Sequence, residues 1–148
     1  MTKRVALVTG GNGGIGSAIC RELAVQGNLV VAGYFPPEKE SAEAWQKEMA
    51  DQSISIELAG MDVSSYEDSE RAIAEVAEKF GPVEILVNCA GITRDGTLKK
   101  MPEANWKAVM ATNLDSAFNT TRHVINGMLE KGWGRIINIA SVNGQRGQ

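Results

Sequence analysis

The chain has 148 residues, of which 43% are hydrophobic and 22% are charged, and its formal net charge is −3. This length and composition predict one globular domain and exclude a disordered chain. The negative charge argues against binding to a nucleic-acid backbone, and no apolar run approaches the roughly 18 residues that a membrane helix needs. Two cysteines and one histidine are too few for a disulfide scaffold or a structural zinc site. We therefore expect a cytoplasmic protein with no metal and with no nucleic-acid or membrane partner.

Short β-rich runs alternate with longer helical patterns along the chain. The predicted strands cover residues 4–9, 29–35, 54–59, 84–88 and 134–139, and the predicted helices cover residues 14–26, 37–51, 65–80 and 103–131. Ser64 and Glu67 form a capping box that starts the third helix, and Gly27 and Gly81 stand where helices end. This alternation predicts βαβ units, so the fold class is α/β, a doubly wound parallel sheet with helices on both faces.

The helical segment 103–131 has apolar residues over much of its circumference. One row consists of Trp106, Met110, Leu114, Phe118, Ile125 and Met128, and a second row consists of Val109, Ala117 and Val124. Packing into the core of one chain explains such a pattern, and so does additional packing against a second subunit. Asn113 lies at helical spacing from Trp106, Val109 and Ala117, so we expect its amide to face packed surface and to be buried and hydrogen-bonded.

A glycine-rich turn, T-G-G-N-G-G-I-G over residues 9–16, follows the first strand and opens the first helix. Glycines let a backbone turn sharply and approach a ligand closely. The free N–H groups and the dipole at the start of a helix suit a pyrophosphate. A flexible loop without a ligand is the alternative. Because the flanking strand and helix are predicted independently, the pattern favours nucleotide binding.

The spacing of this turn, T-G-x-x-x-G-I-G, resembles that of the short-chain dehydrogenase/reductase family. Three further elements occur in the order of that family. Residues 88–91, Asn-Cys-Ala-Gly, resemble its N-N-A-G element, Asn113 lies in the long helix, and Ser141 follows the fifth strand. The resemblance covers the whole chain and implies a Rossmann-type sheet with strand order 3-2-1-4-5.

The resemblance also implies a set of cofactor-binding residues. They are Gly10, Asn12, Gly14, Ile15 and Gly16 in the turn, Tyr34 and Lys39 after the second strand, Asp62 and Val63 after the third, and Asn88, Ala90 and Gly91 after the fourth. The Asp62 carboxylate would accept from the adenine amino group, or it would cap the helix that starts at Ser65. Asn88 would also pin neighbouring strands.

The end of the second strand indicates which cofactor is bound. An NAD-binding site places an acid there for the ribose hydroxyl, whereas the end of this strand, A-G-Y-F-P-P over residues 32–37, contains no acid and is followed by Glu38. A 2′-phosphate would meet no repulsion there, and we expect Lys39 to reach it. The predicted cofactor is therefore NADPH.

Two residues carry the chemistry that the resemblance implies. The Ser141 hydroxyl would donate to the substrate carbonyl and stabilise the developing alkoxide, or it would only cap the turn that follows. Asn113 would hold a water of a proton relay, would make a structural hydrogen bond to a neighbouring strand or helix, or would do both. We expect His123, Cys20 and Cys89 to be structural.

The substrate prediction rests on finer resemblances. Residues 91–95, G-I-T-R-D, are typical of reductases of 3-oxoacyl thioesters, and residues 132–136 and 141–148 resemble the branch that acts on acetoacetyl-CoA. This implies NADPH-dependent reduction of acetoacetyl-CoA to (R)-3-hydroxybutyryl-CoA for polyhydroxybutyrate biosynthesis, with Asp95, Gln145 and Gln148 contacting the substrate. The alternatives are a 3-oxoacyl-acyl-carrier-protein reductase of fatty-acid synthesis and a non-catalytic nucleotide-binding module. Carrier-protein enzymes usually have a basic residue where this chain has Gly13.

The family's proton donor is a tyrosine in a Tyr-x-x-x-Lys motif. The two tyrosines of this chain, Tyr34 and Tyr66, are followed four residues later by Glu38 and Glu70. We therefore expect residues 1–148 to be the N-terminal, NADP-binding portion of a single-domain reductase that is a homotetramer when complete. The sheet would be truncated before its last strands, and the chain would be inactive alone.

Overall fold

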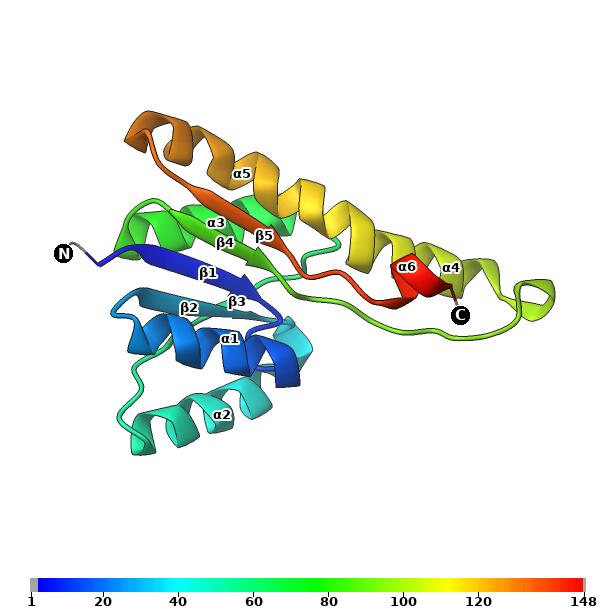
Figure 1. The fold of residues 1–148 in the computed structure, drawn as a ribbon, viewed down its shortest axis with the longest axis horizontal. Coiled ribbons are helices and arrows are strands. Elements are labelled where there is room, and N and C mark those ends of the chain that lie inside the picture. The colour runs from blue at the N-terminus through cyan, green and yellow to red at the C-terminus, as the bar shows by residue number, and fades with distance from the viewer. Residues whose placement is uncertain (1–2, 148) are drawn as a thin grey trace.

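The computed structural model describes residues 3–147 and contains one parallel sheet (Figure 1). Its strands are β1 (Val5–Thr9), β2 (Leu29–Tyr34), β3 (Glu57–Gly60), β4 (Ile85–Asn88) and β5 (Arg135–Asn138). They are ordered β3-β2-β1-β4-β5, and every pair is parallel. The predicted fold class and strand order are confirmed.

Helices cover both faces of this sheet, and each face has its own core (Figure 1). The helices α1 (Gly14–Val25) and α2 (Lys39–Asp51) lie on one face, and α3 (Tyr66–Phe80) and α5 (Ser116–Lys131) lie on the other. The alternation of side chains along β1 divides its residues between the two cores, with Leu7 in one and Val8 in the other. A strand covered on both faces is apolar throughout, and complete burial of Leu7 contributes about 2 kcal/mol.

Two predicted boundaries were wrong by a few residues. β3 begins at Glu57 rather than at residue 54, because the chain first closes the end of α2. Ser53 has a φ of 61°, and the N–H of Ile54 donates to the carbonyl of Met49, which is the geometry of a left-handed helix end. The predicted helix 37–51 is divided into a 3-10 turn, η1 (Pro36–Glu38), and α2, because prolines lack the N–H that a longer helix would need.

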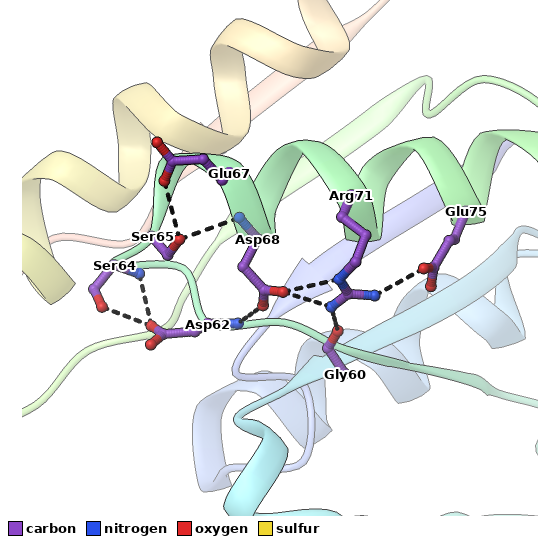
Figure 2. A network of polar contacts seen from close by, with 8 residues as sticks. All are labelled: Gly60, Asp62, Ser64, Ser65, Glu67, Asp68, Arg71 and Glu75. Atoms are coloured by element: carbon purple, nitrogen blue, oxygen red, sulfur yellow. Dashed lines mark hydrogen bonds and ion pairs between the residues drawn. The ribbon is translucent and has the colours of Figure 1, made fainter.

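The predicted capping box is also one residue too early. Ser65, not Ser64, is the N-cap of α3, and its hydroxyl accepts from the N–H of Asp68 at 3.1 Å. The Ser64 hydroxyl is already used, because it donates to the Asp62 carboxylate at 2.6 Å. Ser65 contacts Glu67 at 3.4 Å, as Figure 2 shows.

The long helical segment is interrupted by one wider turn. It consists of α4 (Glu103–Met110), the π-helical turn η3 (Ala111–Asp115) and α5. Val124 and Met128 are buried in the core, whereas Trp106, Leu114 and Phe118 are 54%, 57% and 62% exposed. The apolar rows therefore divide between core and surface. In the part of the chain that the structure describes, no helix has both the length and the apolar character to cross a membrane.

Candidate nucleotide-binding site

A cavity of about 700 Å³ opens at the carboxyl ends of the strands, where open α/β sheets bind their ligands. Its volume is in the range of cofactor pockets. It is lined by most of the residues predicted to bind the cofactor, namely Gly10, Asn12, Gly14, Ile15, Gly16, Tyr34, Asp62, Val63, Ala90 and Gly91. Residues far apart in the sequence therefore line one cavity, and their contact with a cofactor stays a prediction.

The geometry of the turn explains its glycines. Gly10 has a φ of +63°, which favours a residue without a side chain. A Cβ on Gly11 would lie 2.6 Å from the Cβ of Ala32, and a Cβ on Gly16 would collide with the carbonyl oxygen of Gly10. The turn can therefore fold tightly against β2 only with glycine at these positions. At Gly14, by contrast, a Cβ would meet nothing within 4 Å.

Helix α1 begins at this turn, and the residues of its first turn, Gly14, Ile15 and Gly16, line the cavity. Its N-cap is Gly13, no side chain caps it, and its first turn contains no acidic residue. The start of a helix then offers unpaired N–H donors and the positive end of its dipole. Together with the open space at Gly14, this arrangement fits the pyrophosphate of a dinucleotide.

Thr9 organises the opposite wall and was not assigned a role from the sequence. It is 2% exposed, and its hydroxyl oxygen accepts from the N–H groups of Cys89 and Ala90, each at 3.0 Å. These bonds fix the backbone after β4 against the glycine turn, where a Cβ on Gly10 would lie 3.0 Å from the Cα of Ala90. The sequence feature that could have indicated this role is the position of Thr9 as the first residue of the T-G-x-x-x-G-I-G pattern.

Two predicted cofactor residues lie elsewhere. Asn88 does not line the cavity. Its amide donates to Asn138 at 2.8 Å and accepts from the Thr120 hydroxyl at 2.6 Å, so it pins β4 to β5 and to α5. Lys39 also lies outside the cavity wall, with its ammonium 3.7 Å from the carboxylate of Glu43.

The charged residues at the cavity differ from those expected near a 2′-phosphate. Glu38 lines the cavity in place of its neighbour Lys39. Arg94, which belongs to the G-I-T-R-D motif of residues 91–95 and was not predicted to bind the cofactor, lines it as well. The number of residues after the second strand does not predict whether Glu38 or Lys39 faces the cavity, because that depends on the geometry of the 3-10 turn.

Asn113 is hydrogen-bonded as expected, but the expectation that it is buried was wrong. It lies exposed in the π-helical turn, where its amide accepts from the N–H of Ile92 at 2.8 Å and donates to the carbonyl of the same residue at 2.9 Å. A structural hydrogen bond is therefore present, but it fixes the loop after β4 rather than the strand or helix that was predicted. The relay water stays a prediction.

Ser141 follows β5 as predicted, and it is exposed. Its hydroxyl oxygen accepts from the N–H of Asn143 at 3.2 Å, so it caps the turn before α6 (Asn143–Arg146). Asp95 and Gln145 are exposed, and Gln148 lies outside the described residues.

The structural role expected of Cys20 and Cys89 stays a prediction, and Cys89 also lines the cavity. Burial, together with the neighbouring Cys89, raises the pKa of the Cys20 thiol to about 12, and burial also raises the pKa of Cys89. Both thiols are therefore protonated at neutral pH and are poor nucleophiles. His123 packs against the Tyr66 ring, with 4.5 Å between the centroids. Among residues 3–147, no group of three His, Cys, Asp or Glu side chains is arranged to hold a metal.

Comparisons with known proteins agree with this geometry. A family model described as short chain dehydrogenase matches residues 4–148. The acetoacetyl-CoA reductase of Allochromatium vinosum is 57% identical over 145 residues, which are 98% of this chain and 59% of that protein. This chain therefore spans less than two thirds of the length of that relative.

Two solved structures share the fold. A gluconate 5-dehydrogenase from Burkholderia cenocepacia J2315, in complex with NADP and tartrate, matches with a TM-score of 0.88 and 34% identity, over 98% of this chain and 56% of that chain. A variant of actinorhodin polyketide ketoreductase with NADPH matches with a TM-score of 0.92 and 36% identity, over 99% of this chain and 56% of that chain. With its matching family model, its parallel sheet and its glycine-lined cavity, the chain belongs to the short chain dehydrogenase family.

Proposed function

We propose that residues 1–148 are the NADP-binding, N-terminal portion of a single-domain reductase that converts acetoacetyl-CoA to (R)-3-hydroxybutyryl-CoA. The observation that carries this proposal is the uncapped start of α1 at a glycine-lined cavity. The substrate comes from the similarity to a protein named acetoacetyl-CoA reductase. In this reading, the product supplies polyhydroxybutyrate synthesis.

Different residues of the cavity would bind different parts of the cofactor. The N–H groups at the start of α1 would bind the pyrophosphate, Asp62 and Val63 would hold the adenine, and Tyr34 would flank the adjacent ribose. A bound nicotinamide would supply the hydride. The loop that Thr9 and Asn113 fix would support the nicotinamide side.

Ser141 would act on the substrate. Its hydroxyl would donate to the ketone oxygen, where negative charge develops. Asp95, Gln145 and Gln148 would contact the acyl-CoA. Because neither tyrosine of the chain belongs to a Tyr-x-x-x-Lys motif, residues 1–148 alone would show no turnover.

NADPH is the proposed cofactor, supported by two family members whose structures hold NADP or NADPH. Arg94 is the cationic side chain that lines the cavity, whereas Lys39 pairs with Glu43. We further propose that the complete enzyme is a cytoplasmic homotetramer. The exposed apolar side chains Trp106, Leu114 and Phe118 of the long helical segment support association.

Steady-state kinetics of the complete gene product test this function. We expect it to oxidise NADPH in the presence of acetoacetyl-CoA, and to do so much faster than it oxidises NADH. A higher kcat/KM with acetoacetyl-acyl-carrier protein than with acetoacetyl-CoA would instead assign the enzyme to fatty-acid synthesis. Absence of turnover with either thioester, in a protein that still binds NADPH, would favour the non-catalytic module.

A further inference from the structure

The loop between β3 and α3 forms one wall of the cavity through Met61, Asp62, Val63 and Ser64. The N–H of Met61 bonds to the Tyr34 carbonyl at 2.9 Å, and beyond this point the chain leaves the sheet. A loop outside a sheet must satisfy its backbone groups in another way. The side chains that do so decide where Asp62 and Val63 lie.

Two side chains of α3, Asp68 and Arg71, hydrogen-bond this loop (Figure 2), and neither of them lines the cavity. One carboxylate oxygen of Asp68, Oδ2, accepts from the backbone N–H of Asp62 at 2.7 Å. The other, Oδ1, accepts from Nε and Nη2 of Arg71 at 2.9 and 2.7 Å. Arg71 Nη2 also donates to the carbonyl of Gly60 at 3.0 Å. Asp68 and Arg71 therefore bind backbone groups on both sides of Met61.

A third bond fixes the next residue of the loop. The buried amide of Asn119, on α5, donates to the carbonyl of Val63 at 3.0 Å. Asp62 itself accepts from the N–H and the hydroxyl of Ser64 through one oxygen, Oδ1. The backbone on either side of the Asp62 side chain is thus held by two helices, which fixes the direction of that carboxylate.

We propose that Asp68 and Arg71 are positioning residues that set the adenine-binding wall of the cavity by clamping the backbone of Gly60 and Asp62. This inference rests on the proposed nucleotide binding. Neither residue lines the cavity, so each would act on the cofactor through Asp62 and Val63. Charge-assisted hydrogen bonds are stronger and shorter than neutral ones, which suits a pair that holds a loop in one place.

A purely local role is the competing explanation. Asp68 and Arg71 lie three residues apart on α3, and such pairs stabilise a helix slightly. The two explanations differ in the backbone groups that they involve, because Gly60 and Asp62 lie before the helix. The ion pair between Arg71 and Glu75, at 2.9 Å, lies entirely within α3 and provides a matched control.

Hydrogen exchange on the ligand-free chain tests the clamp directly. We expect Asp68→Asn to accelerate exchange of the Asp62 amide by about tenfold, the scale of one lost charge-assisted hydrogen bond. Arg71→Gln should do the same more weakly, and Glu75→Gln should leave exchange at Asp62 unchanged. Unchanged exchange in both clamp variants would overturn the proposal.

Titration with two cofactor fragments tests the consequence for binding. The fragments are 2′-phospho-ADP-ribose, which contains the adenine, and reduced nicotinamide mononucleotide, which lacks it. Asp68→Asn should weaken the first by about tenfold and leave the second unchanged, because only the adenine wall moves. An equal loss for both fragments in Asp68→Asn would indicate general destabilisation and would overturn the positioning role.

The two measurements also separate this inference from the function on which it rests. If the wild-type chain binds neither fragment, the proposed nucleotide binding fails, and hydrogen exchange still decides whether the clamp exists. If it binds both fragments and Asp68→Asn affects neither, the clamp proposal fails while the nucleotide site stands.

Discussion

Single side chains fix most of the backbone that surrounds the cavity. Thr9 accepts from two N–H groups after β4, and Asn113 bonds both polar groups of Ile92. Each backbone group that is bound in this way avoids the cost of an unpaired donor or acceptor. The result is a site whose walls are held in position before a ligand arrives, which lowers the entropy cost of binding.

The role proposed for the Ser141 hydroxyl can be tested by substitution. In the complete enzyme, we expect Ser141→Ala to lower kcat by about a hundredfold or more, because one donor to a developing oxyanion is worth that much. Ser141→Thr keeps the hydroxyl and should retain more of the rate. If Ser141 only caps the turn at Asn143, the alanine variant should unfold at a lower temperature and keep its kcat.

The residues that were predictable from sequence are those with one structural use. Gly10 and Gly16 are recognisable because no other residue fits their positions. Lys39 and Glu38 are adjacent, exposed and flexible, so only the three-dimensional turn shows which one lies at the cavity. Asn88 has an amide that suits either a ligand or a neighbouring strand, and the structure places it between strands.

The start of helix α3 combines two functions in one element. Ser65 caps the helix, while Asp68 in its first turn bonds the preceding loop. Burial alone would raise the pKa of Asp68, but the Asp62 N–H and the Arg71 guanidinium outweigh it and hold the pKa below its ordinary value. The ionised carboxylate is thus favoured by the folded state.

This lowered pKa predicts part of the acid sensitivity of the chain. A carboxyl pKa that is lower in the folded state stabilises the fold at pH values above the ordinary pKa of 3.8. This contribution is lost as the pH falls through the lower pKa of the folded state. We therefore expect Asp68→Asn to flatten the fall in the free energy of unfolding below about pH 4. Urea unfolding between pH 6 and pH 3 measures this, and an acid limb identical to that of the wild type would contradict it.

Element types and their order were predictable, whereas local details were not. The alternation of apolar strands and amphipathic helices determined the sheet. The π-helical turn was not predictable, because a helical period carries no signal for one inserted residue, and it left Asn113 exposed. Ser64 and Ser65 are equivalent in a capping pattern, and the Asp62 side chain decides between them.

Several apolar side chains along the long helical segment of α4, η3 and α5 are exposed to solvent. Leu114 and Phe118 are more than half exposed, and Phe118 stacks on Tyr66 with 6.1 Å between the centroids. Large exposed apolar patches mark sites of association. The exposure of this surface therefore supports the proposed association of the chain.

We expect residues 1–148 to self-associate, and Phe118→Ser to shift them toward the monomer because it removes an exposed apolar contact. Leu129→Ser is a matched control, since Leu129 is 71% exposed near the other end of α5. Sedimentation velocity at several concentrations gives the distribution of species. Equal shifts in both variants would show that association depends on general hydrophobicity rather than on the Phe118 region.

The proposed function depends on the N-terminus of α1 facing a bound dinucleotide. Ile15 lies in the first turn of α1, lines the cavity and is 63% exposed, so its replacement should not disturb the core. An acid at this position favours the helix but repels a pyrophosphate. The decisive measurement is titration of residues 1–148 with NADPH in the wild type, Ile15→Asp and Ile15→Asn. We predict that the wild type binds and that Ile15→Asp weakens binding by about tenfold or more. Ile15→Asn loses the same apolar contact without a charge and should weaken binding less. A wild-type chain that does not bind NADPH, or equal losses in the two variants, would contradict the claim.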